Sequence, residues 1–199
     1  AGFSFYPGKN LGAFGDAGAL TTDQTDLYQK LQSLHLHGED DRFHSYRHSR
    51  LGINSRLDAI QAAVLNVKLT HLDRWNAARR EARKHYDALI LGKGANADFI
   101  QAPIETAGGK SVFHQYAIRA KDRDRLLDYL RQRRIGAAVY YPIPVHLQPC
   151  FKDLGYHHGN FPEAERAAHE VLSLPIYPQI TPSQQKTVIQ VLRDFYHSV

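Results

Sequence analysis

The sequence predicts an α/β fold, and two observations lead to that prediction. Strand-like apolar runs alternate with segments of helical periodicity along the 199 residues. A Gly-rich turn over residues 7–16 also joins two short apolar runs, a pattern typical of paired strands. The hydrophobic content of 43% and the charged content of 23% are ordinary for a globular protein and exclude the disordered and fibrous classes.

The first elements are two strands, a helix and a loop. Residues 3–6 and 17–21 are the expected strands on either side of the Gly-rich turn. Thr22 and Asp23 are candidate caps for the helix that follows, in which apolar residues recur at helical spacing. Residues 35–55 are rich in His and Arg and lack periodicity, so we expect a long functional loop there.

The middle of the chain predicts one long helix over residues 57–91. Its apolar residues recur three and four positions apart, which places them on one face. We expect a bend near Thr70, and a helix of this length is suited to linking two domains.

The remaining elements follow from alternation, caps and prolines. Further strands are expected over residues 98–102, 112–120 and 137–141. Helices are expected from Asp122 to Arg134, over residues 162–172, and from Thr181–Pro182 onward, where Thr181 and Gln184 form a candidate capping box. The prolines between residues 142 and 149 predict a structured surface loop that contains His146.

Composition also bounds the environment and the partners. No run approaches the ~18 apolar residues of a membrane helix, and no export signal is visible. The single Cys150 has no partner for an intramolecular disulfide, so we expect a reducing, cytoplasmic setting. The net charge of +5 could suit nucleic acid, but the basic residues of the predicted long helix are interleaved with acidic ones, which indicates a solvated face.

Two counts concern histidine and methionine. The twelve histidines lack carboxylate or thiolate partners at ligand spacing, so we predict no metal site. The sequence has no methionine, and its first residues would open directly into a strand. We therefore expect the chain to be part of a longer protein.

Lys9 lies at the centre of the Gly-rich turn and is the first candidate for chemistry. A lysine that forms an imine must lose its proton, which requires a confined site where burial or a nearby cation lowers its pKa. A tight turn could supply that confinement, although exposed turn lysines without a function are common. The spacing is not that of a nucleotide-triphosphate loop, because Lys9 leads into a strand and not into a helix.

The whole stretch from Phe3 to Ala19 closely resembles the cofactor-lysine segment of the DegT-type sugar aminotransferases. This resemblance implies a PLP (pyridoxal 5′-phosphate) enzyme of fold type I that aminates keto-sugars attached to nucleotides. Lys9 matches the lysine that forms the Schiff base, and Ser4 matches a serine that holds the cofactor phosphate. The implied fold is the carboxy-terminal part of such an enzyme, α/β in class.

Further blocks resemble the same family in the same order. In residues 52–63, Asn54 matches an asparagine that reaches the phosphate of a neighbouring subunit's PLP, and Arg56 matches an arginine beside that site. The resemblance therefore implies a homodimer with shared active sites. The segment 172–178 is similar as well, so the likeness covers essentially the whole chain.

The resemblance also suggests residues for the substrate. Residues 140–149 resemble the loop that lines the sugar-nucleotide pocket, which makes Tyr140, Tyr141 and His146 candidate substrate contacts. The tyrosine pair could equally serve core packing, and His146 could be an ordinary loop residue. His37, with the glycine that follows it, matches the end of an Asn-His-Gly loop of the family and is a further candidate.

These matches define the domains and the reaction that we expect. Residues 1–70 would complete a large PLP-binding domain, and residues 71–199 would form a small carboxy-terminal α/β domain. The amino donor would be glutamate and the acceptor a keto-sugar linked to UDP or dTDP, aminated at carbon 3. The aromatic residue and the aspartate that hold the pyridine ring in the family have no counterpart here, so the chain alone is not expected to be a competent enzyme.

Two alternatives stay open. A PLP-dependent sugar dehydratase shares the resemblance, but that branch has histidine in place of the lysine, and Lys9 argues against it. A catalytically inactive dimerisation or regulatory module of the same fold is the second. Formation of a borohydride-reducible imine at Lys9 would distinguish the enzyme from this module.

Overall fold

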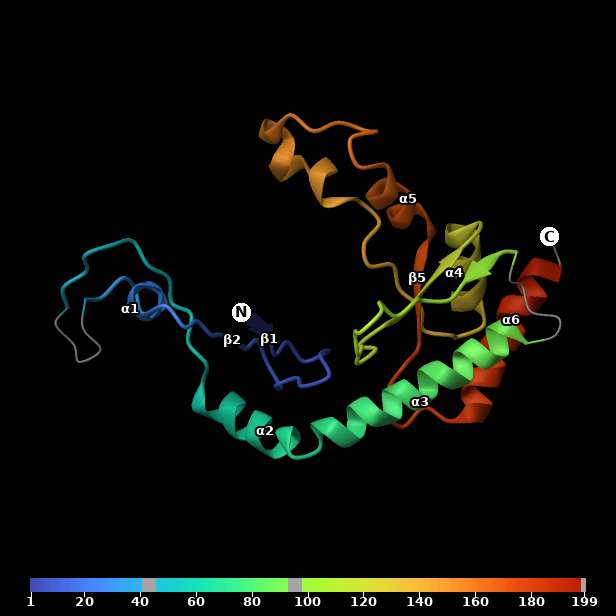
Figure 1. Ribbon diagram of the computed structural model, residues 1–199, viewed down its shortest axis with the longest axis horizontal. Coiled ribbons are helices and arrows are strands. Elements are labelled where there is room, and N and C mark those ends of the chain that lie inside the picture. Colours follow the sequence, from blue (N-terminus) through green and yellow to red (C-terminus); the bar gives the residue numbers. More distant parts are fainter. Residues whose placement is uncertain (41–45, 93–97, 198–199) are drawn as a thin grey trace. The chain divides into compact units, whose positions relative to one another are not determined.

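The computed structural model describes residues 1–40, 46–92 and 98–197, and within them the chain divides into two compact units. The first unit is Ala1–Asp73 and the second is Arg74–Val199. Each contains helices and paired strands (Figure 1), which confirms the predicted α/β class. No helix in these ranges is long and apolar enough to cross a membrane.

The first unit begins with a short antiparallel hairpin. Strand β1 (Gly2–Ser4) pairs with β2 (Gly18–Leu20), with Phe3 opposite Ala19. The pairing continues into the turn, because Phe5 N–H donates to the carbonyl of Ala17 over 2.8 Å. Both strands are shorter than predicted, since the Gly-rich segment between them leaves the ladder to form a turn.

Helix α1 (Thr25–Leu34) follows the hairpin, but its start differs from the prediction. The residue at the cap position is Gln24, and no side chain caps the helix. Thr22 accepts the backbone N–H of Gln24 on its hydroxyl over 3.1 Å and so forms a local turn before the helix. The expected cap by Thr22 or Asp23 is therefore wrong.

The predicted loop after α1 returns on itself. Isolated bridges join Leu36 to Asn54 and Glu39 to His48. Gly38 has φ +81°, and a Cβ there would lie 1.8 Å from the carbonyl oxygen of Arg50, so only glycine fits where the two legs meet. Residues 41–45 of this loop lie outside the described residues.

The predicted long helix is two helices. Helix α2 (Ala59–Leu69) ends at Thr70, and helix α3 begins at Leu72 and ends at Leu91. The hydroxyl of Thr70 donates to the carbonyl of Val67 over 2.8 Å, and such back-bonding competes with the helical ladder. The expected bend near Thr70 is thus a complete break.

The second unit is built on a three-stranded antiparallel sheet. Its order is β3 (Ile100–Gln101), β4 (Tyr116–Ala120) and β5 (Val171–Leu174). Helix α4 (Arg123–Gln132) contacts β5 and α6 (Pro182–His197). The fully buried residues of this core include Tyr86, Tyr116, Ile118, Leu126, Leu130, Leu172 and Leu192.

Two predicted elements of the second unit are corrected. Residues 137–141 do not form a strand, because only Ala138 pairs with the sheet, through a bridge to Ser173. Helix α5 (Pro162–Glu170) stops earlier than expected, and the following residues become β5. Leu172 is completely buried in β5. This strand pairs with β4 on the side opposite β3.

Caps in the second unit agree with the sequence in part. The box at α6 is confirmed, since Gln184 N–H donates to Thr181 Oγ1 over 3.2 Å and Gln184 Oε1 accepts Thr181 N–H over 2.9 Å. Helix α4 begins directly after Asp122, as expected. However, Asp122 has φ +51° and its side chain makes no capping bond.

The proline-rich segment forms two short 3₁₀ helices. The first is η1 (Val145–Leu147) and the second is η2 (Pro149–Leu154). Gly155 ends the second helix with φ +73°, a conformation that glycine adopts without strain. The prediction of a structured loop around His146 is therefore confirmed.

Candidate functional site

Lys9 lies in the turn between β1 and β2. Its backbone N–H donates to the carbonyl of Tyr6 over 2.8 Å, which closes a tight turn. Gly12 fits because a Cβ there would lie 2.4 Å from the carbonyl oxygen of Pro7. Ala13, 1% exposed, fixes the far side of the turn by donating its N–H to Phe5 over 2.8 Å.

Two side chains of helix α2 bind the end of this turn. Gln61 Oε1 accepts the backbone N–H groups of Phe14 and Gly15, over 2.8 and 3.0 Å. Lys68 Nζ donates to the carbonyl of Gly12 over 2.7 Å and lies 4.9 Å from the centre of the Phe14 ring. Three backbone polar groups in residues 12–15 are therefore satisfied by one helix.

The turn does not confine the side chain of Lys9. Lys9 is exposed in this chain, as are Gly8 beside it and Tyr6. A turn fixes the position of a lysine, whereas lowering its pKa by burial requires walls on all sides. The expectation that the Gly-rich turn itself supplies confinement is wrong for these residues.

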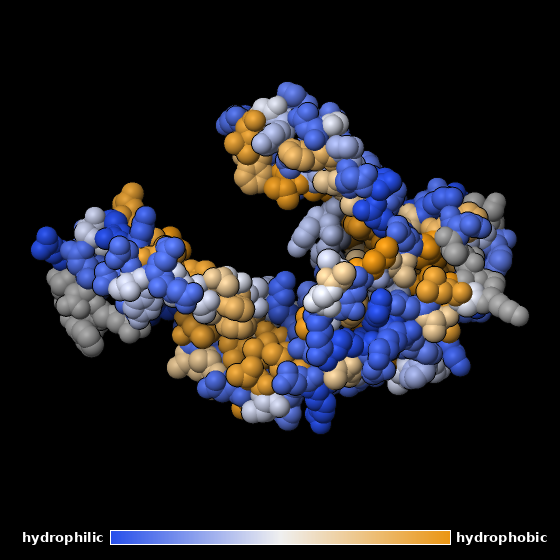
Figure 2. Space-filling view, in the orientation of Figure 1, coloured by the Kyte–Doolittle hydropathy of each residue, from blue (hydrophilic) through white to orange (hydrophobic). Residues whose placement is uncertain are grey.

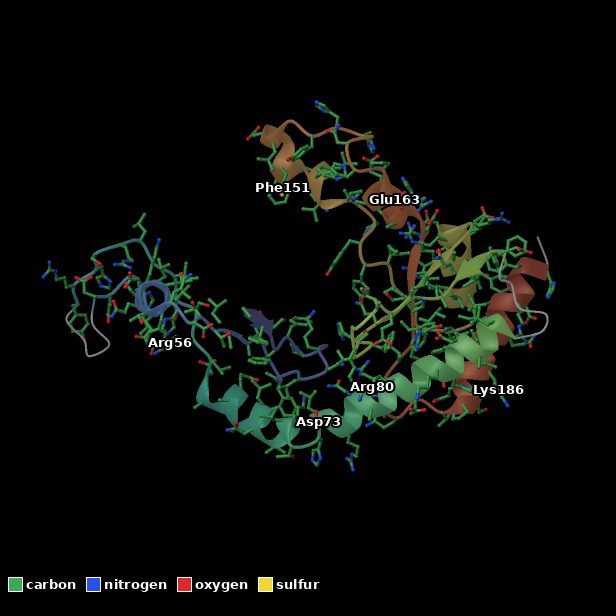
Figure 3. All side chains as sticks on the ribbon, viewed as in Figure 1. Arg56, Asp73, Arg80, Phe151, Glu163 and Lys186 are labelled. Carbon is green, nitrogen blue, oxygen red and sulfur yellow. The ribbon has the colours of Figure 1, made fainter. Side chains whose placement is uncertain are left out.

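A groove of about 910 Å³ in the first unit contains three of the predicted cofactor residues. Ser4 comes from β1, and Asn54 and Arg56 come from the segment before α2. Figure 3 shows Arg56 beside α1. A hydroxyl, an amide and a guanidinium are donors suited to a phosphate, although neither Lys9 nor His37 is among the lining residues.

The segment that carries Asn54 is fixed by backbone pairing. Ile53 N–H donates to the carbonyl of Leu34 over 2.8 Å, and Ser55 N–H donates to the carbonyl of His35 over 3.0 Å. Asn54 therefore sits between two bonded neighbours, in a bridge to Leu36. The pairing explains how a loop residue obtains a defined position.

The groove also has polar lining residues that were not predicted as site residues. Asp16, Tyr28 and His35 contribute to it. The ring of His35 is oriented by Nδ1, which donates to the carbonyl of Leu31 over 3.1 Å. No local sequence pattern identifies these residues, because they come together only through the hairpin and α1.

His37 is exposed and has an unusual backbone. Its φ is +60°, and its N–H donates to the carbonyl of Ile53 over 3.0 Å. Its carbonyl accepts Nδ1–H of His48 over 3.1 Å. These contacts place its backbone in the crossing of the loop, and its side chain stays accessible.

Tyr140 and Tyr141 are exposed in the second unit. Tyr140 is 48% exposed and Tyr141 is 70% exposed. The centres of their rings lie 5.6 Å apart, in an edge-to-face arrangement. Neither tyrosine belongs to the buried core. The packing alternative for this pair is thus wrong, and both rings are accessible to a ligand.

His146 lies in a different environment, bonded to Glu165. The side chain of His146 is 8% exposed, and its Nε2 donates to Glu165 Oε1 over 3.1 Å. Glu165 also accepts the backbone N–H groups of Gly159, over 2.9 and 3.0 Å, and of Phe161, over 3.3 Å. The hydrogen bonds from Gly159, together with those from Phe161, His146 and His158, hold the pKa of Glu165 below its usual value.

An apolar cavity of about 350 Å³ borders the His146 ring. Its walls are Val145, His146, Phe151, Leu154, Tyr156, Phe161 and Ala164. Figure 2 shows hydrophobic residues gathered on this segment, and Figure 3 labels Phe151 on η2 and Glu163 at the start of α5. Residues 145–161 therefore form a small apolar cluster whose polar tie is Glu165.

Within the ranges that the structure describes, no three His, Cys, Asp or Glu side chains are grouped to hold a metal ion. His157 and His158 illustrate the point. His158 Nδ1 lies 3.5 Å from Glu165 Oε2, while the backbone of His157 binds Asn160 Oδ1 over 2.8 Å. The histidines near Glu165 thus take part in fixing a loop.

Comparison with known proteins adds information on relatives. Residues 1–193 match the DegT/DnrJ/EryC1/StrS aminotransferase family. The chain is 46% identical to a "Pleiotropic regulatory protein" of Geobacillus stearothermophilus, over 98% of this chain and 51% of that protein. It is 40% identical to the dTDP-3-amino-3,4,6-trideoxy-alpha-D-glucose transaminase of Streptomyces venezuelae, over 100% of this chain and 51% of that protein.

A solved structure is also similar to this chain in fold and in sequence. The X-ray structure of S. venezuelae DesV in complex with a ketimine intermediate superposes with a TM-score of 0.87 at 39% identity, covering 98% of this chain and 51% of that chain. The chain thus spans about half the length of the curated relatives it matches.

Proposed function

Because the chain belongs to the DegT/DnrJ/EryC1/StrS aminotransferase family, as its sequence predicted, we propose that it forms part of a PLP-dependent sugar aminotransferase in which Lys9 binds the cofactor. The observation that carries this proposal is the position of Lys9 in a hydrogen-bonded turn between β1 and β2, inside a segment that matches the family. Aminotransferases of this family depend on PLP.

The residues of the first unit fit PLP by the chemistry of their donors. The aldehyde of PLP reacts with a primary amine, which Lys9 supplies, and its phosphate accepts hydrogen bonds from a hydroxyl, which Ser4 supplies. Asn54 and Arg56 offer an amide and a guanidinium to the phosphate of the neighbouring site. PLP, when bound, supplies an electron sink for the bond changes at the amino-bearing carbon. The chain's own contribution is to hold the phosphate and to move protons with Lys9 Nζ, a role typically worth ~10²–10⁴-fold.

The substrate part of the proposal concerns the second unit and the loop after α1. We assign contacts with a keto-sugar linked to UDP or dTDP to Tyr140, Tyr141, His146 and His37. The exposed rings of Tyr140 and Tyr141 support this assignment. His146 is held by Glu165 and lines the apolar cavity, so it would meet the substrate from the wall of that cavity.

The reaction proposed is transfer of an amino group from glutamate to carbon 3 of the sugar, in amino-sugar biosynthesis. The name of the Streptomyces venezuelae relative, a 3-amino sugar transaminase, supports that position. We also propose a homodimer in which Asn54 serves the neighbouring site. The setting proposed is the cytoplasm, in keeping with a lone cysteine that has no disulfide partner in the chain.

Trapping the cofactor on Lys9 tests the proposal. The full-length protein is incubated with PLP, reduced with borohydride and digested, and mass spectrometry locates the pyridoxyl group. We expect the label on the Lys9 peptide, its loss in Lys9→Ala, and its retention in Lys30→Ala, which removes an exposed lysine of α1. Absence of label at Lys9 in the unsubstituted protein contradicts the proposal.

A regulatory module without catalysis is the second candidate, favoured by the name of the Geobacillus stearothermophilus relative. Turnover separates the two functions. The PLP-loaded enzyme that has not been reduced should convert dTDP- or UDP-linked 3-keto sugars with glutamate faster than their 4-keto isomers. A protein that is not labelled at Lys9 and aminates neither sugar would support the regulatory function.

A further inference from the structure

Helix α2 carries two side chains whose contacts all converge on the turn that holds Lys9. We propose that Gln61 and Lys68 are positioning residues, which set the place and direction of Lys9 through the backbone of residues 12–15. This inference rests on the proposed function, because it concerns the use of Lys9 as the cofactor lysine.

The spacing of the two residues puts them on the same face of the helix. They are seven positions apart, close to two turns at 3.6 residues per turn. Both are partly buried, and both side chains bind backbone groups of the turn. One helix face therefore contacts both ends of the segment 12–15.

The contacts are directional and complementary. Gln61 presents one acceptor oxygen to two successive N–H donors, those of Phe14 and Gly15. Lys68 presents a charged donor to the carbonyl of Gly12, and a bond with an ionised partner is stronger than a neutral one. Between them the N–H of Ala13 binds Phe5, so four successive residues have fixed backbone groups.

Fixing these residues restricts Lys9, which lies three positions before Gly12. The other side of the turn is fixed as well, because Lys9 N–H binds the carbonyl of Tyr6. The close approach of Gly12 to Pro7 leaves the turn little freedom to shift on its own. The side chain of Lys9 is exposed, but its backbone is fixed on both sides, by the bond to Tyr6 before it and by the bonds to residues 12–15 after it.

This arrangement separates two requirements of a cofactor lysine. Confinement of the side chain is not provided by the turn, as the exposure of Lys9 shows. The direction of the Lys9 side chain is set by α2, through the hydrogen bonds of Gln61 and Lys68 to the backbone of residues 12–15. A misplacement of a reacting group by about 1 Å is enough to cost ~10²-fold in rate, so loosening the backbone should be measurable at Lys9.

The experiment compares variants of the full-length holoenzyme with PLP. Gln61→Met removes the acceptor at similar length, and Gln61→Glu keeps an acceptor oxygen. Lys68→Met removes the donor and Lys68→Arg keeps it. Asn66→Met is the matched control, because Asn66 is an exposed amide on the same helix.

Three quantities are measured for each variant. The first is the single-turnover rate with glutamate, followed by the cofactor absorbance. The second is the midpoint of the pH titration of that absorbance, and the third is the yield of borohydride label on Lys9. Circular dichroism reports whether each variant is folded, and its change on heating gives the thermal midpoint of unfolding.

We expect Gln61→Met and Lys68→Met each to lower the single-turnover rate by ~10–100-fold and to displace the pH midpoint. Gln61→Glu and Lys68→Arg should restore both towards the unsubstituted values, and Asn66→Met should change neither. A merely structural role would lower the thermal midpoint without moving the pH midpoint, and that result overturns the inference. If Gln61→Met does not fold, the comparison of Lys68→Met with Lys68→Arg tests the inference by the same criteria.

The outcomes also separate this inference from the proposed function. If Lys9 is labelled and Lys9→Ala abolishes the label, but both Met variants behave like Asn66→Met, only the positioning role fails. If Lys9 is not labelled even in the unsubstituted protein, the proposed function fails first and the positioning role fails with it.

Discussion

Gly12 is the residue at which the turn around Lys9 is tightest. A Cβ at this position would lie 2.4 Å from the carbonyl oxygen of Pro7 and 2.9 Å from that of Tyr6. Both obstacles are backbone atoms, which cannot rotate away. Gly8, on the other side of Lys9, is different, because a Cβ there would meet only the ring of Tyr6 at 3.8 Å.

These two glycines give a matched pair of substitutions. Gly12→Ala should destabilise the full-length protein by about 1–3 kcal/mol, as overpacking typically does, and should reduce the label on Lys9 because the turn must open. Gly8→Ala should change stability by less than about 0.5 kcal/mol. Chemical denaturation and the yield of borohydride label measure the two effects. Equal behaviour of the two variants would show that the turn is not under steric control.

The sequence predicts the turn that contains Lys9, but not the side chains that support this turn. The Gly-rich segment marks a turn by local composition alone. Gln61 and Lys68 cannot be found in that way, because they bind backbone groups 46 to 56 positions away and neither side chain is unusual for a helix. The exposure of Lys9 was missed for the same reason, since burial depends on what surrounds a turn.

At the scale of elements, the predictions that held are those with a local chemical cause. The box of Thr181 and Gln184 is formed because both partners are within four residues. The cap expected at Thr22 is not formed, because the Thr22 hydroxyl accepts the backbone N–H of Gln24, which precedes the helix. The first two residues of β5, Val171 and Leu172, were predicted as the end of a helix, because they continue the apolar pattern of α5 and only the pairing with β4 reveals a strand.

The cluster of residues 145–161 is held to helix α5 by Glu165. A carboxyl whose pKa is lowered on folding stabilises the folded state above its unfolded pKa, and this contribution is lost as the pH falls through the lowered folded pKa. The bonds from Gly159, Phe161 and His146 should therefore be intact at neutral pH. They should weaken only in acid, below the usual range for glutamate.

Amide hydrogen exchange at Gly159 and Phe161 tests this tie. Protection factors for both amides should be steady near neutral pH and fall below the ordinary glutamate pKa. Glu165→Ala should remove the protection at every pH, whereas Glu163→Ala should leave it unchanged, because the side chain of Glu163 is 73% exposed and pairs with Arg166. Protection in Glu165→Ala equal to that of the unsubstituted protein would contradict the role of Glu165.

At the scale of the whole chain, the two units differ in how much hydrophobic surface they bury. The hydrophobic core of the described residues lies entirely in the second unit, from Ala82 to Tyr196. In the first unit only Ala13 and Leu65 are buried hydrophobic residues among those described, while large side chains such as Phe14 and Leu51 are exposed. Burial of apolar surface is the main stabilising contribution to folding, so the units should differ in stability.

Hydrogen exchange of the 199-residue chain should show that difference. We expect slow exchange in β4, α4 and α6 and fast exchange in β1, β2 and α1, because local opening is easiest where few apolar contacts are lost. In the full-length protein the amides of the first unit should become protected as well. Uniform protection in the 199-residue chain would contradict the expected difference.

The contacts of α2 also make the length of that helix a constraint in its own right. Gln61 and Lys68 meet the turn only because seven positions bring them back to one side of the helix. Inserting one residue between them would rotate Lys68 by about 100° away from Gly12, even if every existing side chain were kept. We therefore expect α2 to accept substitutions on its exposed positions and to reject insertions and deletions between residues 61 and 68, so that the count of residues there matters as much as their identity.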